Sequence, residues 1–101
     1  MARYILIDNN SGFIWGDTHA AAPVDAMRQV DEGIGEFGRS YTEHAPRALR
    51  TTATGCFVYE APADFPEIEN GQDQREIEAV SALPCVAFVA AERPADDDCA
   101  A

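Results

Sequence analysis

Two short apolar runs joined by a turn open the chain and predict a β-hairpin. Residues 4–8 carry apolar side chains on both faces of the expected strand, and residues 13–17 form a second run of the same kind. The intervening Asn-Asn-Ser-Gly sequence is rich in residues that adopt turn conformations. Gly16 interrupts the second run and indicates a bulge or the close approach of a helix. Because the runs are apolar on both faces, we expect the hairpin to lie within a larger sheet.

Helical periodicity predicts two helices, at residues 23–37 and 73–83. The first begins with Pro23, a residue suited to the first helical position, and Gly38 is a suitable C-terminal cap. Its apolar stripe consists of Met27, Val30, Ile34 and Phe37. In the second helix, Asp73 and Glu76 are spaced as a capping box, and Pro84 follows its end. Its apolar stripe consists of Ile77, Val80 and Leu83.

Two further apolar runs, residues 55–60 and 85–91, complete a β-β-α-β-α-β order. This order predicts an α+β fold: a four-stranded, mostly antiparallel sheet with both helices packed on one face. The length of 101 residues indicates a single compact domain, which we place at residues 1–92. Residues 93–101 are expected to form a disordered acidic tail.

The charge balance limits the possible partners. The chain has 18 acidic and 7 basic residues, a formal net charge of −11, and all of its basic residues are arginine. Such a chain is repelled by phosphate backbones and anionic lipid surfaces, so we expect no direct binding to nucleic acid or membranes. A basic protein surface is the natural partner. The alternative is that the acidity reflects only solubility or genome composition. The short apolar segment after Met1 does not resemble a signal peptide, and a cytoplasmic protein is expected.

The strongest concentration of acidic residues defines the first candidate site. Between residues 60 and 78, seven acids accompany only one basic residue: Glu60, Asp64, Glu67, Glu69, Asp73, Glu76 and Glu78, with Arg75. The segment is either a contact surface for a basic partner or a solvated helix face. Trp15 or Tyr4 is expected on an uncovered sheet face, where it adds a hydrophobic contact to the acidic one.

A second candidate site lies in residues 39–54, which form a long and irregular connection. This segment is locally basic within an acidic chain, although residues 49–54 are also compatible with an extension of the strand expected at residues 55–60. One interpretation is a small pocket for an anion or carboxylate, formed by Tyr41, His44, Arg47 and Arg50. The alternative is that its arginines only neutralise neighbouring acids.

Motifs for catalysis and cofactor binding are weak. The sequence from Gly33 to Gly38 matches GxGxxG, but it lies at the expected C-terminal end of a helix, where phosphate binding fails. Three cysteines and two histidines show no spacing typical of zinc ligands. We therefore expect no enzymatic activity, no metal and no cofactor.

In size, acidity and compact α+β design, the chain resembles the small anti-CRISPR proteins of phages and bacterial mobile elements. The resemblance covers general character over the whole chain and includes no matched motif. It implies an inhibitor that acts as a DNA mimic and occupies a CRISPR effector subunit. The alternative function is a small-ligand-binding or regulatory domain that uses residues 39–50 and forms a homodimer through its exposed sheet face.

Overall fold

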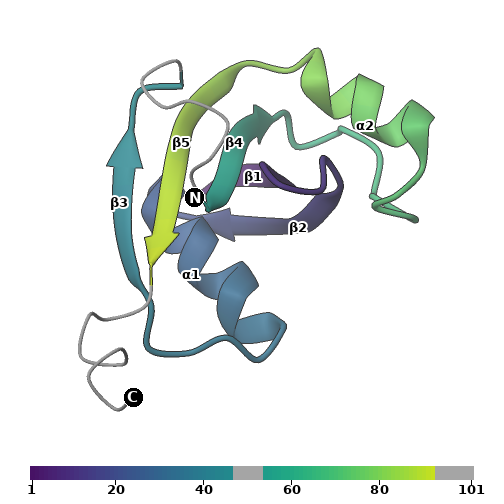
Figure 1. The fold of residues 1–101 in the computed structure, drawn as a ribbon. Coiled ribbons are helices and arrows are strands. Elements are labelled where there is room, and N and C mark those ends of the chain that lie inside the picture. The colour runs from purple at the N-terminus through teal and green to yellow at the C-terminus, as the bar shows by residue number, and fades with distance from the viewer. Residues whose placement is uncertain (47–53, 93–101) are drawn as a thin grey trace.

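The computed structural model describes residues 1–46 and 54–92, which form one antiparallel sheet with two helices (Figure 1). Within these residues the sheet has five strands in the order β2-β1-β4-β5-β3. The elements are β1 (Ala2–Asp8), β2 (Ile14–Ala20), α1 (Pro23–Gly33), β3 (Ser40–His44), β4 (Gly55–Ala61), α2 (Gln74–Ser81) and β5 (Cys85–Glu92). The α+β class and the antiparallel pairing are confirmed. The predicted acidic tail lies outside the described residues.

The number of strands differs from the prediction because the connection after α1 contains β3. This strand pairs with β5, with Tyr41 opposite Ala91 and His44 opposite Phe88. In β3 only Tyr41 and His44 are half-buried, and the other three side chains are exposed. The strand therefore lacks the regular alternation of apolar and polar residues by which a sequence reveals a half-buried strand. Backbone pairing with β5 and the packing of Tyr41 against the core beneath α1 hold β3 at the sheet edge.

The prediction that both helices pack on one face of the sheet is wrong. Side chains at even positions of β1, such as Leu6, lie in a core with Met27 and Val30 of α1. Side chains at odd positions, such as Ile5, lie in a second core with Val80 of α2. We call these two sides the α1 face and the α2 face; Figure 1 shows the two helices at different ends of the sheet. Each helix covers one apolar face of β1, which is why β1 is apolar at every position from residue 4 to 7.

The predicted hairpin is confirmed, and β1 is a central strand whereas β2 is at the edge. Its turn is closed by the Asp8 N–H, which donates to the Phe13 carbonyl at 2.9 Å, and the Ser11 N–H, which donates to Asp8 Oδ2 at 2.7 Å. The register shifts in β2 before Gly16, and a Cβ at Gly16 would lie 2.3 Å from Val30 Cγ2. Gly16 therefore marks both the bulge and the helix contact that its position predicted.

Helix α1 ends four residues earlier than predicted. Gly35 has a φ of +88°, its N–H donates to the Glu32 carbonyl at 3.1 Å, and the Glu36 N–H donates to the Asp31 carbonyl at 2.9 Å. These bonds form a Schellman motif, so Gly35 ends the helix instead of Gly38. As a result, Ile34 and Phe37 leave the predicted apolar stripe and are 53% and 66% exposed. No helix in the described residues is long and apolar enough to span a membrane.

Candidate partner-binding surface

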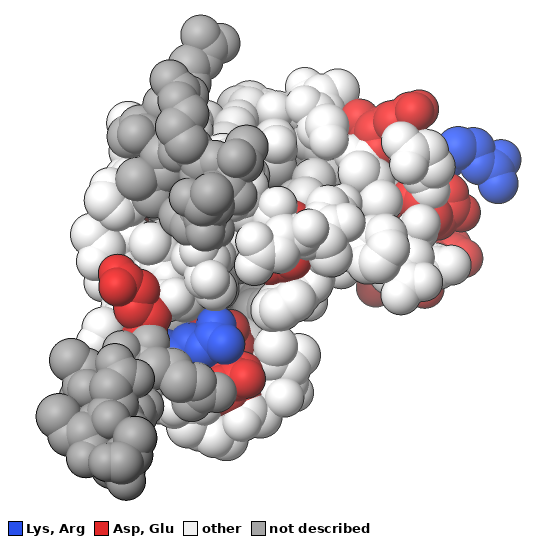
Figure 2. Space-filling model, viewed as in Figure 1, with Lys and Arg blue, Asp and Glu red and all other residues white. Residues whose placement is uncertain are grey.

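Of the seven candidate acids in residues 60–78, all but Glu60 lie on α2 or on the connection that precedes it, residues 62–73. Figure 2 shows acidic side chains gathered at the end of the molecule that carries α2, with a basic side chain projecting beside them. Four of these side chains are exposed: Asp64, Glu67, Glu69 and Glu78. We call these four residues the acidic surface. Asp73 and Glu76 are half-buried, and their carboxylates bond to the backbone within this part of the fold.

Glu60 does not join the acidic surface. It lies in β4 between Tyr59 and Ala61, which both pack on the α2 face. Because side chains alternate along a strand, Glu60 projects toward the α1 face, opposite Tyr4 of β1. Its charge contributes to raising the pKa of the Tyr4 hydroxyl, although burial of that hydroxyl is the larger cause. The sequence interval from 60 to 78 therefore contains residues on two sides of the sheet.

Arg3 fixes the connection that carries three of the four residues of the acidic surface, Asp64, Glu67 and Glu69. Its side chain is 8% exposed, and its Nε and Nη2 donate to the two Asp17 oxygens at 2.9 and 2.6 Å. The same guanidinium donates to the carbonyl of Phe65 and, at 3.0 Å, to that of Pro66. Its carbon lies 5.7 Å from the centre of the Phe65 ring. The Asp17 hydrogen bonds raise the pKa of Arg3, so a permanently charged side chain ties β1, β2 and the connection together.

Further contacts hold the rest of the connection against the sheet. Phe65 and Ile68 pack on the core of the α2 face, and the Ile14 N–H donates to the Gly71 carbonyl at 2.9 Å. Glu76 of α2 accepts the N–H groups of Glu69 and Asn70, both at 2.7 Å. The exposed carboxylates are thus displayed on a segment with a defined backbone.

The predicted capping box is only half present. Asp73 caps α2 by accepting the Arg75 N–H at 2.8 Å. The Glu76 carboxylate does not accept a hydrogen bond from the Asp73 N–H, because that N–H donates to the Asn70 carbonyl at 2.9 Å. Glu76 bonds instead to the preceding connection, so its carboxylate has a structural role that sequence spacing did not reveal.

We expect Glu76→Gln to lower the free energy of unfolding by about 1–2 kcal/mol, because an amide has one acceptor oxygen for two backbone donors. The matched control is Glu78→Gln on the same helix, whose exposed carboxylate accepts a hydrogen bond from the Gln74 side chain at 3.2 Å. That change should cost less than about 0.5 kcal/mol. Urea unfolding measures both; equal losses would show that Glu76 does not hold the connection.

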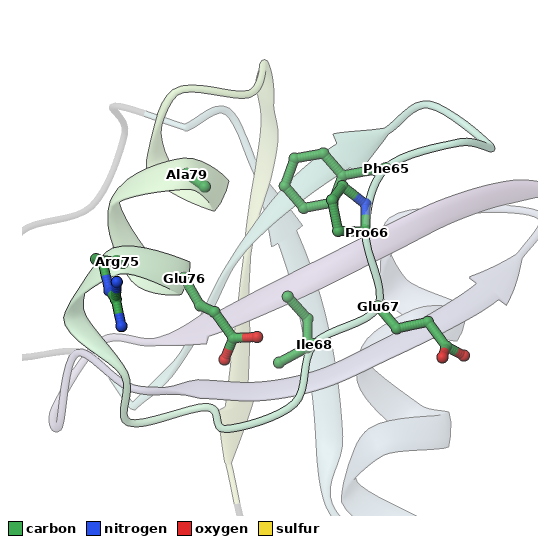
Figure 3. Close-up of a pocket in the computed structure, with 7 residues that line it drawn as sticks. All are labelled: Phe65, Pro66, Glu67, Ile68, Arg75, Glu76 and Ala79. Carbon is green, nitrogen blue, oxygen red and sulfur yellow. The ribbon is translucent and has the colours of Figure 1, made fainter.

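A hollow of about 220 Å³ lies between α2 and the connection (Figure 3). Figure 3 shows Glu76 and Ile68 reaching toward each other from its two sides, while Glu67 points away. The lining residues are Phe65, Pro66, Glu67, Ile68, Arg75, Glu76 and Ala79. Because the Glu76 carboxylate already accepts two backbone N–H groups, the hollow is suited to an apolar side chain more than to an ion.

The two aromatic candidates differ in exposure. Trp15 is 38% exposed at the start of β2, where it lines a hollow against α1. Tyr4 is 7% exposed within the core beneath α1, so its predicted exposure is wrong. Burial of Tyr4 follows from its position in a central strand whose α1 face is covered.

The alternative pocket is not assembled by the described residues. Tyr41 and His44 are three positions apart in β3, so their side chains project to opposite faces of the sheet. Tyr41 packs against the α1 core, whereas His44 lies opposite Phe88 on the other face. Arg47 and Arg50 lie outside the described residues.

Tyr41 belongs instead to a buried polar cluster with Asp31, a residue that the sequence did not single out. The Tyr41 hydroxyl donates to Asp31 Oδ2 at 2.7 Å, and Arg39 Nη1 lies 3.8 Å from the same oxygen. Burial and the Asp31 hydrogen bond raise the pKa of Tyr41 to about 12, so the hydroxyl remains a donor at neutral pH. Asp31 is fully buried and lies four residues after Met27 on the apolar stripe. Its place on the apolar stripe of the helix is the feature of the sequence that indicates its burial.

The described residues contain no group of three or more histidine, cysteine, aspartate or glutamate side chains placed to hold a metal ion. Comparisons with protein-family models, curated proteins and solved structures give no match. The fold and the acidic surface together define the class of the protein. It is a small α+β protein that presents acidic side chains on α2 and on the anchored connection before it.

Proposed function

We propose that this protein binds a basic protein surface that normally holds nucleic acid, and thereby inhibits the partner. The observation that supports the proposal is the acidic surface: three exposed carboxylates on a connection that Arg3 and Glu76 hold in place, and a fourth, that of Glu78, on α2. A CRISPR effector complex is the partner class that the overall resemblance favours. The proposed role is binding and not catalysis.

The physical basis is preorganisation of negative charge. Carboxylates on a mobile loop lose conformational freedom when they bind, whereas an anchored connection has already lost it during folding. Opposing basic side chains on the partner are arranged to contact phosphates, and fixed carboxylates satisfy them in the same way. Arg75, the neighbouring cation, is 93% exposed, and its ion pair within the described residues is a long contact of 3.9 Å to Asp73, which is not one of the four carboxylates.

The test is competition with target DNA for purified CRISPR effector complexes at several salt concentrations. Reversal of the acidic surface to arginine at Asp64, Glu67, Glu69 and Glu78 should abolish competition, and inhibition by the unaltered protein should weaken steeply with salt. Glu76 is left unchanged because it has a structural role.

The control variant reverses four exposed acids that lie outside the acidic surface: Glu32, Glu43, Glu60 and Glu92. It changes net charge by the same amount and should still compete with DNA. If both variants failed to compete with DNA, net charge alone, and not the acidic surface, would account for the competition. Undiminished inhibition after reversal of the acidic surface would refute the proposal, and an absence of binding to every effector tested would remove that partner class.

A further inference from the structure

The outer edge of β2 has no strand beside it among the described residues. The edge is closed at its start, where the Ile14 N–H donates to Gly71. Beyond Ile14, β2 continues to Ala20 with a regular register opposite β1 from Gly16 onward. Five residues of strand therefore present an unpaired edge, which is a template for an added strand.

The hydrogen-bonding pattern identifies which backbone groups this edge presents. The Asn9 N–H donates to the Gly55 carbonyl, so odd-numbered residues of β1 bond to β4 and even-numbered residues bond to β2. In β2, the partners of the even-numbered residues are Gly16, Thr18 and Ala20. The N–H and C=O groups of Asp17 and His19 consequently point outward from the sheet.

A hollow lies on each side of this edge. The one on the α1 side, about 310 Å³, lies between the start of β2 and the exposed end of α1, with Trp15, Val30 and Ile34 among its walls. The one on the α2 side, about 330 Å³, lies between β2 and the connection, with His19, Phe65 and Glu67 among its walls. Asp17 borders both hollows, so they flank the same stretch of strand.

We propose that the β2 edge binds an extended segment of the partner protein as a sixth strand, with apolar and basic side chains in alternation. Side chains alternate between the faces of a sheet, so an added strand directs successive residues into the two hollows. Apolar residues meet Trp15 and Ile34 on the α1 side, and basic residues meet Glu67 on the α2 side. This inference rests on the proposed function, because it takes the partner to be basic.

Charge favours a basic segment over a second copy of this chain. In the α2-side hollow, Arg3 is paired with Asp17 and also interacts with the charge of Glu67, so the lining has two carboxylates for one guanidinium and is negative overall. Antiparallel pairing of two β2 strands would bring two chains of net charge −11 together and place their Asp17 and Glu67 side chains near each other.

The probe is a capped heptapeptide that alternates leucine and arginine, titrated into the ¹⁵N-labelled full chain. Amide signals of Asp17 and His19 should shift and become protected from hydrogen exchange. A peptide of the same composition in scrambled order should bind about ten-fold more weakly because its leucine and arginine side chains no longer alternate between the two hollows. A peptide N-methylated on the amides that face β2 should also bind about ten-fold more weakly, because its main-chain hydrogen bonds are lost.

The matched protein variants are His19→Pro and His19→Ala. Proline removes the outward N–H without changing formal charge and is tolerated at sheet edges, so it should weaken peptide binding about ten-fold, whereas alanine should not. The N-methylated peptide gives the same comparison without altering the protein. Equal binding of the alternating and N-methylated peptides would overturn the inference, as would a dimer in sedimentation analysis that His19→Pro dissociates.

The two proposals fail in different ways. If His19→Pro competes with target DNA as well as the unaltered protein does, the edge inference fails and the acidic-surface proposal stands. If the variant with the reversed acidic surface still competes with target DNA, and the peptide pairs with β2 of the unaltered protein, the proposed function fails. The edge then remains a binding site with another purpose.

Discussion

Replacing Arg3 with methionine is expected to lower the free energy of unfolding by about 3 kcal/mol. The guanidinium bonds to both oxygens of Asp17 and to the carbonyls of Phe65 and Pro66, and it is 8% exposed. Methionine keeps the apolar part of the side chain but leaves the Asp17 carboxylate, 23% exposed, without its counter-ion. Removal of one partner from a buried ion pair costs more than the pair itself contributes, because the remaining charge is poorly hydrated.

The control is Arg28→Met. Arg28 forms an ion pair with Asp25 at 3.0 Å, but both side chains are well exposed, and we expect a loss below about 0.5 kcal/mol. The double variant Arg3→Met with Asp17→Leu should recover at least half of the loss, because it leaves no unpaired carboxylate. Urea unfolding of the four proteins measures these differences. Equal losses for Arg3→Met and Arg28→Met would contradict the assigned role of Arg3.

The importance of Arg3 illustrates what the sequence can reveal about this fold. Local patterns predicted the hairpin, both helices and the last strand, because each depends on the periodicity of nearby residues. Arg3 acts on Phe65 and Pro66, which are more than sixty residues away in the chain. No local pattern encodes such a contact, so the anchoring of the connection emerges only from the structure.

The periodicity of the helices did not by itself predict where they pack. An apolar stripe indicates that a helix packs on a sheet but does not say on which face. The apolar character of both faces of β1 contained that information: two apolar faces require two covers, and the chain has two helices. The five residues of β3 were missed because an edge strand with two half-buried side chains lacks the alternation that reveals a buried strand.

The acidic interval in the sequence does not show how its carboxylates are arranged in the fold. The interval from Glu60 to Glu78 does contain the four exposed carboxylates of the acidic surface. Strand alternation separates Glu60 from them, and hydrogen bonds give Asp73 and Glu76 structural roles. The proposed functional residues are therefore those acids that the fold does not itself use.

The second large effect is expected at Gly55, where alanine should lower the free energy of unfolding by about 3 kcal/mol. Gly55 begins β4 with a φ of +152°, a conformation that residues with a Cβ rarely adopt. A Cβ there would also lie 2.2 Å from the Val89 carbonyl oxygen and 2.9 Å from the Ala90 Cα in β5. These atoms belong to the backbone of a central strand, so they cannot move aside as a flexible side chain can.

Gly33→Ala is expected to have the opposite effect on the free energy of unfolding. Gly33 is the last residue of α1, its φ is not positive, and a Cβ there meets nothing within 4 Å. Alanine at this position should raise the free energy of unfolding by about 0.5–1 kcal/mol, because it restricts the unfolded chain and favours helix. Urea unfolding of both variants tests the pair. If Gly55→Ala were as stable as the unaltered protein, the close approach of β4 and β5 at Gly55 would be wrong, and with it the register that joins the two halves of the sheet.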